Sequence, residues 1–393
     1  MPLTARRQEF KDYFFDREEA ARIVRFFNTQ LTHHVGELAG QPFTLERWQR
    51  RILRRFVGWR HKVTGYRKYR TLYLEVPRKN GKSILAAGLA IYFLDADREK
   101  GARVVCYALN EEQAKEAVFD VASGMVERSK KLSERITVFR KSMSVRKTAS
   151  RFNLISGSKK GKHGKNLSAL VGDEVHEWES RDLYDALRTS MGTRTQPVEI
   201  YLTTAGYDKN TLCYEMHEWT EDVNAGRVED PSHLGVIYAA HPDDDWTDEK
   251  VWAKANPNYG VSVSKEYMER KAKEAYERPE TKNNFLVKNL NVWTNASQQF
   301  IPYDAWKECA GTVELENIDV VLTVEVGRTE ITIRDLLRLN EGSVVELDRL
   351  AGDPLDILVN NTKIAKGEVV MVGERVGIRF GEIVDPEKRV ESI

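Results

Sequence analysis

The chain has 393 residues, of which 41% are apolar and 31% are charged, and its 61 basic side chains nearly balance 60 acidic ones. At about 150 residues per domain, this length predicts two or three domains with a substantial core. The composition excludes whole-chain disorder and a disulfide scaffold, and no apolar run approaches the roughly 18 residues that a membrane span needs.

The first residues and the cysteines indicate the cellular compartment in which the protein is expected. The first twenty residues are charged throughout and lack the apolar centre of a signal peptide. Cys106, Cys213 and Cys309 are far apart and form no CxxC pattern, which indicates neither a zinc site nor a disulfide framework. We therefore expect a cytoplasmic protein with reduced thiols and no membrane insertion.

Basic residues are concentrated in two segments. Residues 47–74 contain ten Lys or Arg and no acid, and residues 135–172 again contain ten and no acid. Such segments are suited to face a polyanion. Solvated helix faces and loops are the alternative explanation for each of them.

The composition changes near residue 311. Every Trp, Tyr, His and Cys precedes this point, and Phe380 is the one aromatic residue that follows it. Residues 317–393 carry 15 acids and 10 bases and are rich in Val, Ile, Leu and Gly. We therefore place a domain boundary at about 311–318 and a weaker one near 230–245, where EDPSH and HPDDDW interrupt the pattern.

A phosphate-binding loop is predicted between Thr71 and Leu94. An apolar strand-like run (TLYLEV) is followed by a polar loop with Arg78, Lys79 and Asn80, then by Gly81-Lys82-Ser83 and a helix-like run. In this order, loop N–H groups and the helix N-terminus hold phosphate oxygens, Lys82 reaches the β/γ-phosphates, and Ser83 binds Mg²⁺. Val76 occupies the place of the first glycine of GxxxxGK[ST], so the Walker A match is incomplete.

A second strand with acids at its end follows about ninety residues later. LSALVGDEVHEW ends an apolar run in Asp173-Glu174, and the carboxyl ends of strands are where an open α/β sheet places its chemistry. Asp173 is the candidate Mg²⁺ ligand, and Glu174 is the candidate general base that polarises the attacking water. A strand that ends in two solvated acids is the alternative.

Two further motifs complete the predicted ATP site. PVEIYLTTAG ends in Thr203, Thr204 and Gly206, which are suitably placed to sense a γ-phosphate. Upstream, FTLERWQRRIL places Trp48 and Gln49 on an expected helix, and a glutamine there can hydrogen-bond both the donor and the acceptor edge of adenine.

Together these residues resemble the ATPase domain of the large terminase of tailed phages, a motor that pumps DNA into procapsids. The similarity covers Phe43 to about Gly311 and includes Trp48-Gln49, VPRKNGKS, GDEVHEW and YLTTAG. DDDWTDEKVWAKANPNYG, FLVKNLNVWTN and FIPYDAWKEC resemble the linker subdomain of such ATPases. The implied fold is an α/β P-loop (RecA/ASCE-like) ATPase domain at 1–235, with a parallel sheet flanked by helices, and a linker or lid subdomain at 236–311.

The resemblance also implies ligands, partners and roles. ATP and Mg²⁺ are the expected cofactors, and double-stranded DNA, the procapsid portal and the small terminase are the expected partners, in the cytoplasm of a bacterial host cell. Arg78 is the candidate arginine that stabilises transition-state charge in cis, with Glu174 and Lys82 as the other catalytic candidates. The alternative for Arg78 and Lys79 is that they are exposed loop cations.

A lysine-rich segment is the candidate DNA contact. SKKGKHGKN (Ser158–Asn166) has glycines between its lysines and no acidic neighbours, as sequence-independent phosphate contacts would require. Its candidate residues are Lys159, Lys160, Lys162 and Lys165.

Residues 317–393 resemble the SpoA-type domain of flagellar motor-switch and type III secretion ring proteins. Turn signals (LNEGS, LAGDP, VNNTK, AKGE, VGER) separate short apolar strands and independently predict a small all-β domain. The resemblance implies an intertwined homodimer without an active site. The clustered acids of a terminase nuclease are not found after Gly311, so we expect no nuclease activity and a natural or engineered fusion.

The leading hypothesis is therefore an ATP-hydrolysing, DNA-translocating motor domain that lacks the terminase nuclease and carries a C-terminal oligomerisation domain. A structural component of a flagellar motor switch or secretion ring, with the ATPase region as its fusion partner, is the alternative. A superfamily-2-like helicase is disfavoured, because no arginine-rich motif of a second RecA-like domain is found.

Overall fold

The computed structural model divides the chain into two compact units, Met1–Ala305 and Trp306–Ile393. It describes residues 10–36, 38–108, 118–156, 166–178, 181–294, 321–350, 352–359 and 362–383. An eight-stranded sheet forms the centre of unit 1, and a four-stranded sheet forms unit 2. No helix in these ranges has the length and hydropathy needed to cross a membrane.

The large sheet has six parallel strands and an antiparallel extension. In sheet order its strands are β10 (His233–Ile237), β3 (Thr71–Glu75), β9 (Val198–Thr203), β8 (Ala169–Asp173), β4 (Arg103–Ala108), β7 (Ser150–Ser156), β6 (Ser142–Val145) and β5 (Ile136–Phe139). The strands from β10 to β7 are parallel, whereas β6 and β5 are antiparallel to their neighbours. The predicted parallel sheet is thus confirmed for the centre, and the sheet as a whole is mixed.

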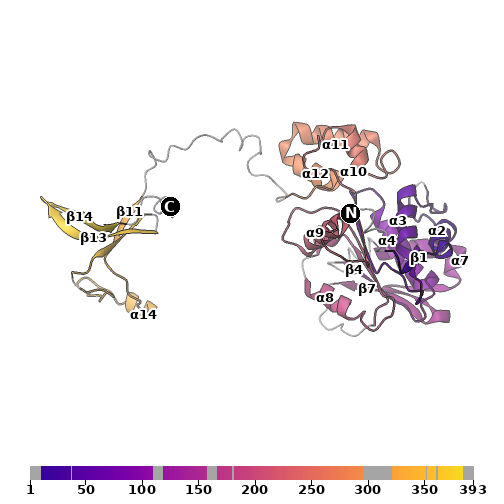
Figure 1. Ribbon diagram of the computed structural model, residues 1–393, viewed down its shortest axis with the longest axis horizontal. Helices are drawn as coiled ribbons and strands as arrows, with labels where there is room; N and C mark the ends of the chain where they lie inside the picture. Colours follow the sequence, from indigo (N-terminus) through magenta and orange to yellow (C-terminus); the bar gives the residue numbers. More distant parts are fainter. Residues whose placement is uncertain are drawn as a thin grey trace. The chain divides into compact units, whose positions relative to one another are not determined.

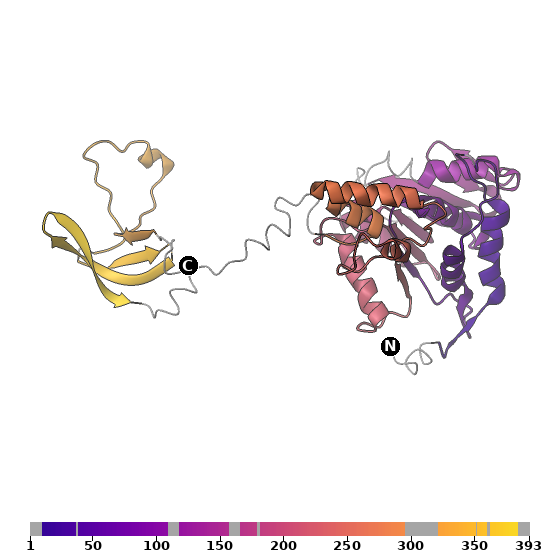
Figure 2. The same cartoon turned by 90° about the horizontal axis from the view of Figure 1, so that it is seen from above.

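Helices cover both faces of this sheet (Figures 1 and 2). One face carries α2 (Arg17–Gln30), α3 (Arg47–Gly58), α4 (Lys82–Ile91), α6 (Asp120–Arg128) and α7 (Lys130–Ser133), and the other carries α8 (Arg181–Thr189) and α9 (Leu212–Ala225). Successive strand residues serve opposite faces: Leu72 and Leu74 join the core under α2, α3 and α4, whereas Tyr73 joins the core under α8 and α9. The predicted α/β architecture is confirmed.

Shorter elements connect these layers. A two-stranded antiparallel sheet joins β1 (Tyr13–Phe15) to β2 (Trp59–His61) beside α2 and α3. Short helical turns in the described residues include the π-helical η1 (Tyr92–Ala96), which extends α4, and the 3₁₀ segments η3 (Arg146–Thr148), η4 (Val175–Glu177) and η5 (Pro279–Thr281).

A small helical subdomain follows β10. It contains α10 (Glu249–Ala255), α11 (Lys265–Glu277) and α12 (Lys282–Leu290), which bury Trp252, Met268 and Phe285 in a core of their own. Asp248 caps α10 and Ser264 caps α11, because each side chain accepts from a backbone N–H in the first turn. These helices lie within the predicted linker region 236–311, whose exact limits stay a prediction.

In its described residues, unit 2 is a four-stranded antiparallel sheet in the order β11 (Leu322–Glu325), β12 (Leu355–Val359), β13 (Thr362–Val372) and β14 (Arg375–Ile383), together with the short helix α14 (Ile333–Leu336). The predicted small all-β domain is confirmed. Its buried side chains include Ile357, Leu358, Val359 and Ala365, whereas many other apolar side chains of the unit are exposed.

Candidate active site

The loop between β3 and α4 turns through two residues with left-handed backbone conformation. Gly81 has φ +80° and is the N-cap of α4, and Lys79 has φ +68°. Val76, at the place of the missing first glycine, is buried, and its N–H donates to the Thr203 carbonyl at 3.0 Å. Residue 76 therefore continues the pairing of β3 with β9, and the position needs no glycine.

Asn80 is fully buried and joins the loop to the helical subdomain. Its amide nitrogen donates to Asn256 Oδ1 at 2.8 Å, and its Oδ1 accepts from the backbone N–H of Asn258 at 3.0 Å. The Ser262 hydroxyl also donates to the Lys79 carbonyl, at 2.6 Å. The shape of the loop thus depends on residues almost two hundred positions away in the sequence.

Lys82 is the first residue of α4, and its side chain is buried against the loop. Its ammonium group donates to the carbonyl oxygens of Val76 at 3.2 Å and Pro77 at 3.4 Å and to the Thr204 hydroxyl at 2.5 Å. Burial lowers the pKa of Lys82, although the nearby carboxylates of Glu174, Asp173 and Glu75 act in the opposite direction. A cation held by neutral oxygens can exchange them for the stronger interaction with phosphate oxygens.

Asp173 ends β8 as a carboxylate that is only 2% exposed. Among the described residues, neither of its oxygens has a partner of full hydrogen-bond geometry. The nearby Ser83 hydroxyl and the backbone N–H of Glu174 lower its pKa, but by less than burial raises it. Burial, followed by the charge of Glu174, raises the pKa of Asp173 to about 7. A carboxylate beside a hydroxyl is an oxygen ligand set that Mg²⁺ accepts. These two residues therefore fit a divalent cation.

Glu174 lies in a sharp turn after β8. Its backbone has φ +47° and ψ 50°, a conformation that is unfavourable for a residue other than glycine. The ring of Trp178 closes the turn by lying against Gly172, where a Cβ would come within 2.5 Å of it. The motif GDEVHEW thus folds back onto its own glycine and leaves the Glu174 side chain 29% exposed.

His176 lies between Glu174 and α12. Burial, followed by the charge of Lys288, lowers the pKa of His176 to about 3, so the ring is neutral. Its Nε2 lies 3.1 Å from Lys288 Nζ, and its Nδ1 lies 3.3 Å from Glu174 Oε2 and 3.2 Å from Thr203 Oγ1. Because an ammonium group can only donate, we assign the ring proton to Nδ1, where it faces Glu174 and Thr203. Burial and the charge of Arg78 lower the pKa of Lys288 to about 8.

The end of β9 connects Lys82 to the turn after β8. Thr204 Oγ1 accepts from the Lys82 ammonium group and donates to a carbonyl of the loop at 3.2 Å. Thr203 Oγ1 accepts from the backbone N–H of His176 at 3.1 Å. Both hydroxyls are buried, so the structure brings these predicted residues together with the loop lysine and the two acids.

Gly206 and the segment after α12 lie in contact. A Cβ at Gly206 would come within 2.8 Å of the Trp293 ring. Nearby, the N–H of Ala205 donates to Asn291 Oδ1 at 2.7 Å. Asn291 Nδ2 and Trp293 Nε1 both donate to Glu75 Oε1, at 3.1 and 3.2 Å. The ends of β3 and β9 are therefore tied to the helical subdomain by the same segment.

Trp48 and Gln49 lie in the first turn of α3. The backbone N–H of Glu46 donates to Gln49 Oε1 at 3.0 Å, as part of a capping box. Gln49 lies beside the loop, because its Nε2 would be 3.6 Å from a Cβ at Gly81. Trp48 Nε1 instead donates to Asn258 Oδ1 at 2.6 Å. The structure thus brings Gln49 to the loop and Trp48 to the helical subdomain.

The two loop cations have different surroundings. The Arg78 side chain is 49% exposed, and its guanidinium group lies 4.0 Å from Glu177 Oε1, in the turn that follows Glu174. Lys79 faces the helical subdomain, with its ammonium nitrogen 3.6 Å from the centre of the Tyr267 ring. Lys159, Lys160, Lys162 and Lys165 lie outside the described residues.

Sequence reasoning missed the residues by which the helical subdomain reaches the site. These are His176, Lys288 and the buried asparagines Asn256, Asn258 and Asn291. Two Asn-x-Asn patterns, at 256–258 and 289–291, are a signal that could have indicated the three asparagines.

Three family models match the chain. The terminase large subunit ATPase domain matches residues 47–222, the terminase large subunit endonuclease domain matches 227–330, and the type III flagellar switch regulator (C-ring) FliN C-terminal domain matches 314–385. Residues 47–222 thus match a terminase large-subunit ATPase domain, and residues 314–385 match a FliN C-terminal domain. Both predicted resemblances are therefore confirmed.

The relatives match separate parts of the chain. Protein YmfN of Escherichia coli K12 is 36% identical over 146 residues, which are 37% of this chain and 32% of YmfN. The flagellar motor switch protein FliN of Pseudomonas aeruginosa is 56% identical over 77 residues, 20% of this chain and 49% of that protein. FliN of Pectobacterium carotovorum is 54% identical over 77 residues, 20% of this chain and 73% of that protein. The chain thus spans about a third of YmfN and half of the first FliN.

The fold of the terminase part has a match among solved structures. The large terminase of bacteriophage HK97 superposes with a TM-score of 0.61 over 70% of this chain and 55% of that chain, at 24% identity. At this level of identity the match shows a shared fold. It supports the α/β architecture described for unit 1.

The expectation that the chain lacks the terminase nuclease domain is wrong, because the endonuclease-domain model matches residues 227–330. Nuclease acids were expected only after Gly311, and residues 236–311 were predicted to form a linker or lid subdomain. The match begins earlier and overlaps that region, including β10 and the three helices of the subdomain. Part of it, residues 295–320, lies outside the described residues. The expectation of no nuclease activity is withdrawn with it.

Proposed function

We propose that the ATPase domain of this chain hydrolyses ATP with Mg²⁺ and uses the reaction to move double-stranded DNA. The buried, unpaired carboxylate of Asp173 next to the buried ammonium group of Lys82 carries the proposal. The terminase family match supports ATP as the substrate and DNA as the cargo. The chain spans only part of the length of its relatives, so its partners and location are also proposals. We propose the procapsid portal and the small terminase as partners, and the bacterial cytoplasm as the location.

The phosphates would bind at the N-terminus of α4. Loop N–H groups from Lys79 to Gly81 and the Lys82 ammonium group would hold phosphate oxygens, as helix N-termini generally do. Asp173 and the Ser83 hydroxyl would hold Mg²⁺, which supplies neutralisation of phosphate charge when bound. Gln49 lies beside the same loop and would contact the adenine. The neighbouring Trp48 belongs to the same proposed adenine motif and contacts Asn258 of the helical subdomain.

The remaining residues would act on the water and the transferred phosphate. Glu174 is the proposed general base, because its carboxylate is partly exposed beside Asp173 and is aimed by a strained turn. Arg78 is half exposed on the same loop and would stabilise transition-state charge. The end of β9 would respond to the presence or loss of the γ-phosphate, because the hydroxyl of Thr204 contacts Lys82 directly. The residues involved would be Thr203, Thr204 and Gly206.

Replacing Glu174 with Gln tests the base. We expect Glu174→Gln to bind ATP with unchanged affinity and to lower kcat by about 10²–10⁴-fold, because the cation ligand Asp173 remains. Lys82→Ala should instead weaken ATP binding. ATP hydrolysis is measured with and without duplex DNA, and Glu218→Gln, an exposed carboxylate on α9, is the control.

Parental turnover in Glu174→Gln would exclude Glu174 as the base. A parent chain that hydrolyses ATP at the same rate with and without duplex DNA, and binds no DNA, would contradict the proposed motor function.

A second pair of variants tests the tautomer of His176. We propose that Nδ1–H of His176 holds the turn after β8 to Thr203 Oγ1 and thereby positions Glu174, whose Oε2 lies 3.3 Å from Nδ1. An Asn amide can place its nitrogen near Nδ1, whereas a Gln amide reaches the position of Nε2. His176→Asn should therefore keep most of kcat, and His176→Gln should lose about 10–100-fold, the usual size of such supporting contacts. KM should change little in both, and equal kcat values in the two variants would contradict the assignment.

We propose that unit 2 joins the chain to further copies of itself. Exposed apolar side chains on β13 and β14 include Met371 at 68%, Val376 at 67% and Val372 at 65%. Surface of this kind on a small β domain indicates a partner interface. The match to the FliN C-terminal domain supports the same conclusion.

Met371 and Val376 are paired across β13 and β14. The double variant Met371→Lys, Val376→Glu places opposite charges in that pair, which keeps the hairpin stable while removing the apolar surface. Light scattering should give at least a dimer for the parent and a smaller species for this variant. A charge swap at the paired Glu368 and Arg379 is the control, and a monomeric parent would contradict the proposal.

The DNA contacts of Lys159, Lys160, Lys162 and Lys165 remain a prediction. So do the domain limits 1–235, 236–311 and 317–393.

A further inference from the structure

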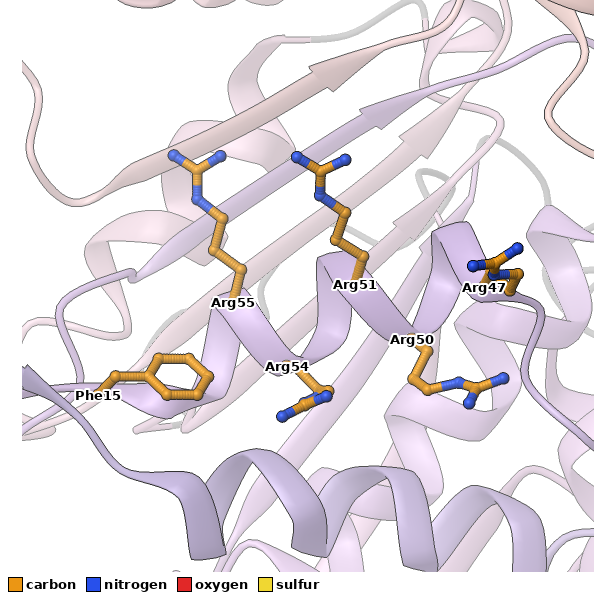
Figure 3. Close-up of a pocket in the computed structure, with 6 residues that line it drawn as sticks. All are labelled: Phe15, Arg47, Arg50, Arg51, Arg54 and Arg55. Carbon is orange, nitrogen blue, oxygen red and sulfur yellow. The ribbon is translucent and has the colours of Figure 1, made fainter.

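Helix α3 presents five arginines on its exposed side. Together with Phe15 they line a surface cavity of about 340 Å³: Arg47, Arg50, Arg51, Arg54 and Arg55 (Figure 3). Figure 3 shows Arg51 and Arg55 next to each other on one side of the helix and Arg50 and Arg54 on the other. We call these five residues the α3 arginine ridge.

The guanidinium groups of the ridge form no ion pair within the described part of the chain. Arg50 donates to the Leu45 carbonyl at 3.4 Å, and Arg55 donates to the Tyr69 hydroxyl at 3.3 Å, so both contacts are neutral. The acids of the neighbouring α2 bind other arginines: Glu18 pairs with Arg25, and Glu19 pairs with Arg22, Arg60 and Arg98. The charge of the ridge is therefore not neutralised by the fold.

The ridge also opposes the stability of its own helix. Arg47, Arg51 and Arg55 follow each other at intervals of four residues, as do Arg50 and Arg54, and like charges at this spacing repel. Arg47 and Arg50 lie at the start of α3, where the helix dipole disfavours positive charge; the acid at this end is the N-cap Glu46, whose side chain accepts from the backbone in the capping box. A bound polyanion would relieve both effects.

We propose that the α3 arginine ridge binds the phosphodiester backbone of double-stranded DNA. From Arg47 to Arg55 it extends about 12 Å along the helix axis at 1.5 Å per residue, and duplex DNA offers one negative charge per about 1.7 Å of its axis. All five cations are arginine, whose planar group binds phosphate through two parallel hydrogen bonds. This inference rests on the proposed DNA-moving function.

An acidic protein is a poorer match for this surface. The centre of a protein interface is usually apolar and poor in charge, whereas among the described residues that line the cavity Phe15 alone is apolar. The regular spacing of the charges and the lack of an apolar centre favour a backbone of repeating phosphates.

The test uses the full chain and a short fluorescent DNA duplex. Binding is measured over a range of salt concentrations for the parent, for Arg50→Gln with Arg54→Gln, and for Arg51→Gln with Arg55→Gln. The matched control is Lys130→Gln with Lys131→Gln, which removes two exposed charges from α7. Each ridge variant should reduce the slope of log K against log salt by up to about 1.8, at ~0.9 per phosphate contact, and the control should leave it unchanged.

Two further measurements separate the ridge from folding and from catalysis. The melting temperature of the ridge variants should equal or exceed that of the parent, because repulsion along α3 is reduced. ATP hydrolysis without DNA should be unchanged, since none of the four arginines is placed in the nucleotide site.

Slopes equal to that of the parent in both ridge variants would overturn the inference while leaving the proposed function intact. A parent that binds no duplex at any salt concentration would overturn both. Unchanged DNA slopes together with lost binding to poly-glutamate would assign the ridge to an acidic polypeptide and likewise overturn the proposal.

Discussion

Two carboxylates are buried at the C-terminal ends of parallel strands in the large sheet, and they differ in their hydrogen bonding. Glu75, at the end of β3, accepts from the Tyr73 hydroxyl at 2.6 Å, from His217 at 2.9 Å, from Asn291 and from Trp293. Asp173, at the end of β8, has no partner of full hydrogen-bond geometry among the described residues. A buried polar group without a partner typically costs about 1–3 kcal/mol, and Asp173 is therefore the group whose partner a ligand would supply.

The helical subdomain is connected to this site through hydrogen bonds to amide groups. Asn256 and Asn258 bind Asn80 of the loop, and Asn291 binds both the end of β9 and Glu75. Lys288 reaches His176 from α12. If Lys82 exchanges its loop carbonyls for phosphate oxygens, as proposed, the resulting shift of the loop would be transmitted directly to these amides. The proposed nucleotide site is therefore coupled to the helical subdomain by hydrogen bonds.

The sequence motifs predicted the elements that carry the chemistry, and the residues beyond those motifs escaped prediction. Strand, loop and helix around Lys82 and the strand before Asp173 have strong local patterns, and the structure places both at one sheet edge. Asn256 and Asn258 contact residues about 180 positions away, and an asparagine has no local pattern that reveals such a partner. His176 lies within the motif GDEVHEW, but its contact with Lys288 comes from a distant helix and has no local pattern. The endonuclease match was missed because acids were sought only after Gly311.

A structure of the chain with a non-hydrolysable ATP analogue and Mg²⁺ would test the proposed nucleotide site most directly. We expect the Lys82 ammonium group to leave the carbonyls of Val76 and Pro77 and to bind phosphate oxygens, with the cation next to Asp173 and Ser83. A nucleotide bound elsewhere, or a bound nucleotide with Asp173 still without a partner, would contradict this proposal.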